Sequence, residues 1–529
     1  MVDAREYHDR TNHDPESVRE QYTPPDPAIK PRPYKRYRDL SVEPLEGVRP
    51  PVQPTLSVIG EPVADPLAGT EQSSAGDLDR RTLATLLYEA NGVVNRVTRN
   101  GEEVLFRAAS CTGKLYHVDC YAVCGDLEGL PAGVYHFDPR RFSLDVLRTG
   151  DYRGVLAEAV GESAASDGGS QAAENETGIA DAPVTVVATS TWWRNAWKYR
   201  ERTYRHAFWD AGTVLANLLG AAHALDTRAE VVAGFADGAV SRLVGVDPTE
   251  EAPVALVPLG RDEPTPEPRA VDPIDPETEP LSADPVDYPL IHEAWRQSTL
   301  ESGDDAAAWR ARCLDVGEID ALAPGAGGSE SGERVALEPV DHETATARPL
   351  HHTIVRRGSR REFSDRGPTR RQVGTVLDRA LRGVPGDWNG GEATGLAYND
   401  VVVLSTDVEG VPDGTYRYDH EEATLERTGD ANSELQTELA LEQSWAGDAH
   451  VNVYLLADIG TVVDRLGNRG YRLAQLEAGV ALGRLYLATF AHRALGGTGL
   501  TFYDGLVADH CAPESGAMPT CLFAFGRSA

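Results

Sequence analysis

The pattern of apolar and polar positions divides the chain into two long foldable regions and two polar ones. Residues 51–261 and 346–529 contain β-branched runs that favour strands and amphipathic stretches that favour helices. Residues 1–50 are polar and rich in proline, and residues 262–345 are acidic and rich in proline, with one expected helix around 288–300. We therefore expect an extended N-terminal arm, a first domain, an interdomain linker and a second domain.

The two expected domains repeat each other in sequence. LEGLPAGVYHFDP followed by RTGD in the first domain corresponds to VEGVPDGTYRYDH followed by RTGD in the second. A long apolar helix is expected at 200–225 and again at 467–495, in register at an offset of 267 residues. Each domain also begins with an amphipathic helix and ends in an apolar strand.

This order of elements predicts an α+β fold, in which a central mixed or antiparallel sheet is flanked by helices in each domain. Two copies in one chain further suggest an internal two-fold arrangement. In such an arrangement the domains pack as an intramolecular pseudo-dimer, as two subunits would in a homodimer.

Charge and composition exclude several classes of function. The 529 residues include 50 Lys and Arg against 83 Asp and Glu, for a net charge of −33, which excludes nucleic-acid binding through a general basic surface and disfavours an anionic membrane. No apolar run is long enough to cross a bilayer, and the first residues lack the apolar core of a signal peptide, so we expect a cytoplasmic protein. Only four of the basic residues are Lys, and this acidic, lysine-poor composition is typical of halophilic archaea.

The second domain begins with a cluster of basic and hydroxyl side chains. In IVRRGSRREFS, four arginines and a serine crowd six positions, at 356–361. Guanidinium and hydroxyl donors beside a glycine suit a phosphate or another anion. A basic strand edge paired with surface carboxylates would explain the same cluster, so charge alone leaves both interpretations open.

The segment RRGSRREFS, followed by an amphipathic helix, resembles the start of a domain of the nitroreductase superfamily, whose members bind FMN. The first domain resembles the SagB/ThcOx branch, which oxidises azolines to azoles in peptide natural products. This resemblance rests on YHDRTNHDPESV, SCTGKLYHVDCYAV and WKYRERTYRHAFWDAG. It covers nearly the whole chain outside the linker and a polar insertion at 163–178, and it implies two tandem nitroreductase-like domains.

The resemblance implies roles for individual residues. Lys198 and Tyr199 match a catalytic Lys-Tyr pair, in which the lysine is the implied base because a desolvated lysine can lose its proton and an arginine cannot. An ion pair with Glu201 remains the alternative for Lys198, and core packing remains the alternative for Tyr199. No metal site is expected. The residues implied to bind FMN are Arg357, Gly358, Ser359 and Arg361 of the second domain, Ser110, Thr112, Gly113 and Lys114 of the first, and Arg527 as a further candidate for the phosphate.

The two domains depart from the family pattern in a complementary way. The first has no arginine between Arg49 and Arg80, where its own phosphate-binding run should lie. The second has Arg465 and Leu466 where the Lys-Tyr pair would align. One interface site is therefore complete and the other is not, so we expect one FMN per chain.

The leading prediction is an FMN-dependent oxidoreductase. It would transfer a hydride from a small or peptide-borne substrate, such as an azoline, to flavin N5, with a cyclodehydratase as a candidate partner. One alternative is a non-catalytic tandem module that binds a peptide or a partner protein. Another is a nitro or quinone reductase that uses the same cofactor. The sequence does not separate these substrates.

Overall fold

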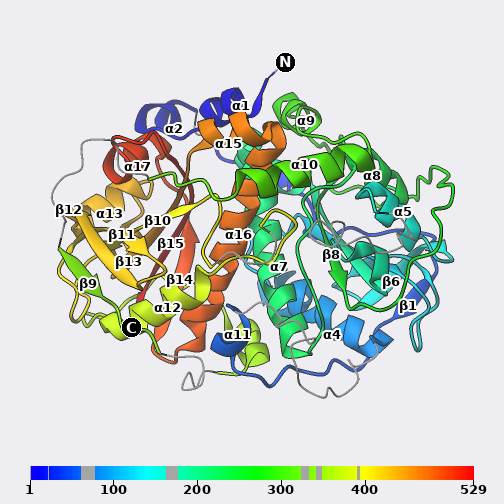
Figure 1. Cartoon of the computed structure of the whole chain (residues 1–529), viewed down its shortest axis with the longest axis horizontal. Helices are drawn as coiled ribbons and strands as arrows, with labels where there is room; N and C mark the ends of the chain where they lie inside the picture. The colour runs from blue at the N-terminus through cyan, green and yellow to red at the C-terminus, as the bar shows by residue number, and fades with distance from the viewer. Residues whose placement is uncertain are drawn as a thin grey trace.

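The computed structural model describes residues 2–21, 23–60, 78–99, 101–162, 177–322, 333–340, 348–389 and 394–529. In this part of the chain two large antiparallel sheets lie on either side of two long central helices (Figure 1), and two further strands, β2 and β3, form a separate two-stranded sheet. The strands are β1 (Val42–Pro44), β2 (Val93–Arg99), β3 (Glu102–Arg107), β4 (Val118–Cys124), β5 (Gly133–Asp138), β6 (Ser143–Thr149), β7 (Val184–Thr191), β8 (Glu251–Leu259), β9 (Arg334–Ala336), β10 (Asp400–Ser405), β11 (Gly414–Asp419), β12 (Thr424–Gly429), β13 (Val451–Ala457), β14 (Leu495–Leu500) and β15 (Met518–Arg527).

Helices surround both sheets and form the boundary between the two halves of the chain. The α-helices are α1 (Ala4–Arg10), α2 (Pro15–Gln21), α3 (Thr55–Val58), α4 (Arg80–Asn91), α5 (Arg153–Ala159), α6 (Trp192–Tyr199), α7 (Thr203–Ala224), α8 (Asp237–Val244), α9 (Pro289–Arg296), α10 (Gly303–Val316), α11 (Leu350–Arg356), α12 (Arg370–Ala380), α13 (Ser433–Leu439), α14 (Ser444–Asp448), α15 (Ile459–Leu466), α16 (Asn468–Ala491) and α17 (Asp504–Cys511).

The two sheets share a strand order. The first sheet runs β1-β6-β5-β4-β7-β8, and the second runs β14-β15-β13-β10-β11-β12-β9. Its segment β12-β11-β10-β13-β15 has the same order as β6-β5-β4-β7-β8, and every neighbouring pair is antiparallel. Each half is therefore an antiparallel sheet flanked by helices, which confirms the predicted mixture of helices and strands.

The core of the molecule lies where α7 and α16 cross. Both helices are apolar around most of their circumference, and nearly all of their residues are buried. At the crossing, a Cβ on Gly212 would lie 2.3 Å from the carbonyl carbon of Gly479, and a Cβ on Gly479 would lie 2.6 Å from the Phe208 carbonyl oxygen. Only glycine permits so close an approach of two backbones. Nearby, Tyr204 and Tyr471 stack at a centroid distance of 6.5 Å.

A buried ion-pair cluster joins the start of α7 to the second half. Arg202 Nη1 lies 2.9 Å from Asp504 Oδ2, and Arg205 Nη1 lies 2.8 Å from Asp504 Oδ1. Arg205 also donates to the Thr11 hydroxyl, at 3.1 Å from Nε and 2.8 Å from Nη2. Arg202 and Arg205 thereby connect the first half both to Asp504 of the second half and to the N-terminal segment, which contains α1.

A matching cluster joins the start of α16 to the first half. Arg469 Nη1 and Arg472 Nη1 lie 2.5 Å and 2.6 Å from the two oxygens of Asp237, and Arg472 Nε donates to the Ser298 hydroxyl at 2.8 Å. Each of these charged residues stands 267 positions from its counterpart in the first cluster. The contacts between the halves are therefore reciprocal, and α9 of the linker occupies the place that α1 occupies in the other cluster.

The arm and the linker are more structured than the sequence predicts. The arm at 1–50 was expected to be extended, yet it contains α1 and α2. The linker at 262–345 contains α10 in addition to the expected helix α9, and β9, which pairs with β12 in the second sheet. Tertiary contacts such as the arginine clusters order these polar segments. Of the described helices, none is long and apolar enough to cross a bilayer.

Candidate functional site

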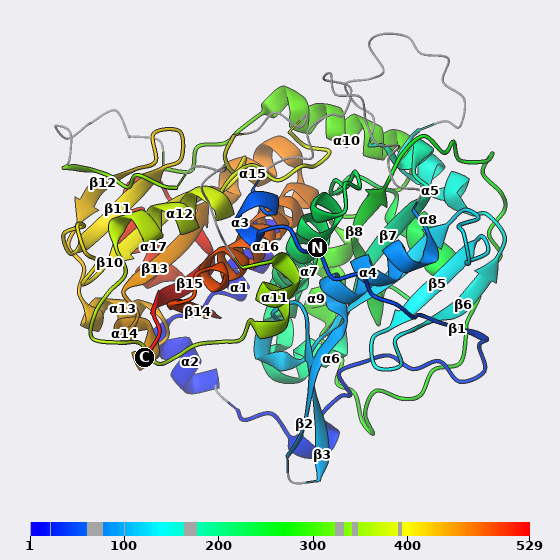
Figure 2. The same cartoon turned by 90° about the horizontal axis from the view of Figure 1, so that it is seen from below.

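The arginine cluster of the second half reaches into the first half directly after α11. Arg357 donates to the Ala108 carbonyl oxygen from Nη2 at 3.0 Å and from Nε at 3.2 Å. Its guanidinium also lies over the Tyr486 ring, 5.2 Å from the centroid. Figure 2 shows α11 against α7, at the boundary between the halves. Ala108 stands two positions before Ser110. Arg357 therefore contacts the first half directly beside the predicted loop Ser110–Lys114.

The Lys-Tyr pair ends α6 on the opposite side of this boundary. Lys198 Nζ lies 5.0 Å from the centroid of the Tyr199 ring, and Tyr199 packs edge-to-face with His206 at 4.6 Å. Gly113 has φ +64°, and a Cβ there would lie 2.9 Å from the Tyr199 hydroxyl oxygen. The loop can approach Tyr199 this closely because position 113 is glycine.

The charge of the second half acts on Lys198 of the first. Partial desolvation of the Lys198 ammonium and the positive charge of Arg361 both lower the pKa of Lys198. The Arg361 guanidinium stacks on Trp445, 4.4 Å from the ring centroid. Burial, followed by the charge of Asp210, raises the pKa of Tyr199, so its phenol is neutral near pH 7. The charge of Arg361 of the second half thus acts on both residues of the predicted catalytic pair of the first.

The cations predicted for this site lack the carboxylate partners that are common elsewhere in this acidic chain. Over the ranges that the structure describes, no ion pair forms at Lys198, and none forms at the predicted cofactor ligands Lys114, Arg357, Arg361 and Arg527. The alternative ion pair between Lys198 and Glu201 is not found. Cations left without counter-charges in a chain of net charge −33 form a donor set that suits an anionic group.

The remaining predicted ligands lie in separate segments of the two halves. Arg527 ends β15, and its carbonyl oxygen accepts from the Ser364 N–H at 2.9 Å, which places it beside the segment that follows the arginine cluster. Gly358 and Ser359 lie within the arginine cluster; Gly358 is half-buried, Ser359 is exposed, and a Cβ at position 358 would meet nothing within 4 Å. Lys114 is exposed, with Nζ 5.2 Å from the centroid of the Phe106 ring.

Sequence reasoning missed the residue that holds the loop in place, Asp210 of α7. Its carboxylate accepts from the Thr112 N–H at 2.9 Å and 3.0 Å, from the Thr112 hydroxyl at 2.8 Å and from the Cys111 thiol at 3.0 Å. His117 Nε2 lies 2.7 Å from the same carboxylate. The signal was an acidic residue in the middle of each apolar helix, since Glu477 stands 267 positions after Asp210.

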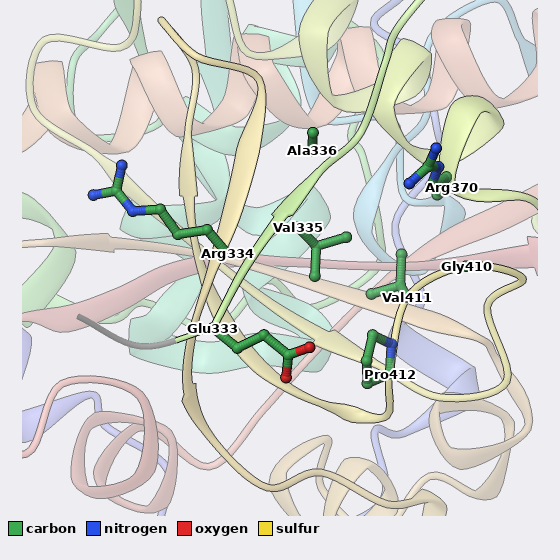
Figure 3. A pocket seen from close by; sticks show the side chains of 8 residues that line it. All are labelled: Glu333, Arg334, Val335, Ala336, Arg370, Gly410, Val411 and Pro412. Atoms are coloured by element: carbon green, nitrogen blue, oxygen red, sulfur yellow. The ribbon is translucent and has the colours of Figure 1, made fainter. Parts of the chain in front are cut away.

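An open surface depression lies far from these residues, along the edge strand β9 of the second sheet (Figure 3). None of the predicted site residues lines it. The residues that line it are Glu333, Arg334, Val335, Ala336, Arg370, Gly410, Val411 and Pro412. The chemistry described above therefore belongs to the boundary between the halves.

Comparison with known proteins gives this geometry a context. Residues 76–261 match the model of the nitroreductase family. Over 184 residues the chain is 27% identical to a Methanocaldococcus jannaschii protein assigned as nitroreductase MJ1384, which covers 35% of this chain and 81% of that protein. The first half is thus nitroreductase-like in sequence, and members of the family are generally FMN-dependent oxidoreductases.

Solved structures extend the likeness in fold to the second half. A crystal structure assigned as a nitroreductase of Anabaena variabilis ATCC 29413 aligns over 99% of both chains, with a TM-score of 0.73 and 21% identity. Part of the Escherichia coli microcin synthetase McbBCD complex, solved with truncated pro-MccB17 bound, aligns with 48% of this chain and 90% of its own at 20% identity. Its TM-score of 0.29 is too low to support an inference. The nitroreductase-like fold therefore extends over both halves.

Proposed function

We propose that this chain is an FMN-dependent oxidoreductase that holds one FMN between its two halves and oxidises azoline rings on peptides to azoles. The observation that carries the proposal is the contact of Arg357 of the second half with Ala108, two residues before the Ser110–Lys114 loop of the first half. In addition, neither Lys198 nor Arg361 has a carboxylate partner among the described residues, and the charge of Arg361 acts on Lys198. The proposal also rests on the nitroreductase-like sequence of the first half.

The donor set fits the anionic and hydroxyl-rich end of FMN. Arg357, Ser359, Arg361 and Arg527 would hold the phosphate and the ribityl chain from the second half. Ser110, Thr112, Gly113 and Lys114 would close over the cofactor from the first. Guanidinium groups bind phosphate through paired hydrogen bonds, and glycine at 358, where a Cβ would meet nothing within 4 Å, leaves the backbone open to close approach.

When bound, FMN supplies a two-electron acceptor. Conversion of an azoline to an azole removes two hydrogens, one as a hydride and one as a proton, and Lys198 would take the proton at Nζ. Its lowered pKa favours the neutral amine that this role needs. Tyr199, kept as a neutral phenol, would orient the substrate by donating a hydrogen bond.

The paired architecture follows from the same proposal. The common strand order, the crossing of α7 and α16 at Gly212 and Gly479, and the reciprocal arginine clusters support a duplicated, fused dimer. In such a pseudo-dimer each half contributes part of one site. A single chain then carries what two subunits would otherwise provide. An enzyme that forms azolines, such as a cyclodehydratase, would supply the substrate.

Single-turnover kinetics test the proposal. The chain is loaded with FMN and mixed without oxygen with a thiazoline-bearing peptide. The flavin absorbance should bleach, and mass spectrometry should show a product that has lost two hydrogens. If azolines do not bleach the bound FMN, but quinones or nitro compounds reoxidise it after chemical reduction, the azoline substrate is wrong. The result would then favour a nitro or quinone reductase. A chain that binds no FMN would favour the non-catalytic alternative.

A further inference from the structure

Within the loop Ser110–Lys114, the Lys114 N–H donates to the Cys111 carbonyl oxygen at 3.1 Å, but the backbone of the loop is strained. Gly113 and Lys114 both have positive φ, at +64° and +59°, and the loop lies exposed at the boundary between the halves. Positive φ is costly for a residue such as lysine, so an external contact has to fix this conformation. That contact comes from Asp210, which is buried in α7 and 3% exposed.

Asp210 binds the loop through hydrogen bonds to both its backbone and its side chains. The bonds from the Thr112 N–H, the Thr112 hydroxyl and the Cys111 thiol converge on one carboxylate. His117 approaches the same carboxylate through Nε2, and its Nδ1 lies 2.9 Å from the Ser190 hydroxyl, which orients the imidazole. A buried carboxylate that accepts several hydrogen bonds is well compensated and rigid.

The anchored loop lies directly against the Tyr199 side chain. Gly113 follows Thr112 directly and contacts the Tyr199 hydroxyl region. The charge of Asp210 also acts on the Tyr199 phenol and raises its pKa beyond the effect of burial. Other ionisable groups around that phenol are Lys198 on its own helix, His206 of α7, Cys111 in the loop and Arg361 of the second half, whose charge lowers the pKa.

We infer that Asp210 is a positioning residue of this site, which holds the Ser110–Lys114 loop against Tyr199 and presents a fixed negative charge to the phenol. This inference rests on the proposed function for its meaning in catalysis. With Asp210 in place, Tyr199 stays a hydrogen-bond donor, and the role of base falls to Lys198. Asp210 would thus separate the two roles within the Lys-Tyr pair.

The second half contains a matched control. Glu477 stands at the corresponding position of α16 and accepts from the Ala397 N–H at 2.6 Å, the Tyr398 N–H at 2.9 Å and the Asn399 amide at 2.8 Å. Glu477 anchors residues 397–399 in the same way. These residues belong to the second half, in which Arg465 and Leu466 replace the Lys-Tyr pair. Loss of Glu477 should therefore affect stability alone.

Two measurements on the full chain test the inference, with Asp210→Asn compared to Glu477→Gln. The first is the FMN dissociation constant from fluorescence titration, which Asp210→Asn should raise on the order of tenfold, the loss expected when a hydrogen bond to a charged group is broken. The second is the alkaline ultraviolet titration of Tyr199 without FMN, isolated by subtracting the same titration in a Tyr199→Phe background. In Asp210→Asn the phenol should ionise at lower pH, because a neighbouring negative charge is gone.

Glu477→Gln should leave both quantities unchanged even if it lowers the unfolding midpoint. If Asp210→Asn does not fold, Cys111→Ala removes one bond to the carboxylate and should weaken FMN binding in the same direction by a smaller factor. Unchanged FMN affinity and an unchanged Tyr199 titration in the folded Asp210 variant would overturn the inference, as would an equal effect of Glu477→Gln on FMN. Absence of FMN binding by the wild-type chain would instead overturn the proposed function, and the Tyr199 titration would still decide the role of Asp210.

Discussion

The two equivalent positions at the boundary between the halves differ in what fills them. At the first, the exposed Lys198 lies in the last turn of α6, where the charge of Arg361 acts on it, and neither cation has a carboxylate partner among the described residues. At the second, Leu466 takes the place of Tyr199, and its carbonyl oxygen accepts from the Trp309 indole N–H at 3.0 Å. Trp309 comes from α10 of the linker and is 3% exposed. The chain itself therefore covers the second position.

Other contacts complete the closure of the second position. The carboxylate of Asp387 accepts from the Ala233 and Gly234 N–H groups at 2.9 Å and 2.8 Å, and Arg310 donates to the Gly234 carbonyl oxygen at 3.0 Å. A Cβ on Gly234 would lie 2.7 Å from the Arg310 side chain. Backbone groups here are paired within the protein, so little remains to bind a ligand. The comparison teaches that the first position keeps cations without carboxylate partners among the described residues, whereas at the second position Leu466 is buried beneath Trp309 and the neighbouring Arg465 is exposed.

The largest expected effect is on the rate of flavin reduction, which should depend on Lys198 at the first position and not on Arg465 at the second. Lys198→Arg retains the charge but loses the ability to give up a proton, so substrate-dependent flavin reduction should fall by about 10² to 10⁴ while FMN binding is kept. Stopped-flow bleaching of the flavin measures this rate. Arg465→Lys, at the equivalent position of α15, is the matched control and should change nothing. Wild-type rates in Lys198→Arg would mean that another group takes the proton.

The two arginine clusters should contribute equally to the stability of the fold. In this they differ from the two boundary positions, which we expect to differ in function. Removing one member of a buried ion pair costs about 3–5 kcal/mol. Asp504→Asn and Asp237→Asn should therefore lower the free energy of unfolding by similar amounts, measured by urea denaturation. A loss confined to one variant would break the reciprocity between the halves.

The Asp504 cluster also predicts a response to acid. Burial alone would raise the pKa of Asp504, but the charges of Arg202 and Arg205 outweigh it and hold that pKa below its usual value. The stability from this group is therefore full above about pH 4, the usual range of a free Asp carboxyl, and is lost as the pH falls further. Unfolding of Asp504→Asn should depend less on pH in that acidic range than unfolding of the wild-type chain.

A smaller effect is expected at the anion-binding end. Arg357→Ala removes a guanidinium from the proposed phosphate site and should weaken FMN binding by about tenfold to a hundredfold, the range for charge-assisted hydrogen bonds. Fluorescence titration with FMN measures it. Arg360→Ala is the control, because Arg360 packs beside Gly496 and its N–H donates to the Gly497 carbonyl oxygen. Equal losses in both variants would indicate a general effect of charge.

Periodicity predicted the elements that build each half, because apolar spacing alone identifies buried strands and helices. The helices expected at 200–225 and 467–495 correspond to α7 and α16, and the repeat predicted a common strand order. The roles of the Arg-rich segment and the Lys-Tyr pair remain predictions from resemblance. The hydrogen bonds from the Ser110–Lys114 loop to Asp210, and the hydrogen bond from Trp309 to Leu466, were not predicted. Each joins residues about 100 to 160 positions apart in the sequence.

The central claim is that one position binds the cofactor and the other does not. The most direct test is the stoichiometry of FMN, from flavin absorbance against protein mass after saturation with FMN and removal of the excess, with light scattering to give the size of the particle. We predict one FMN per chain in a monomeric particle, because both parts of the open position belong to the same polypeptide. Two FMN per chain, or binding only in a dimer of chains, would contradict the account.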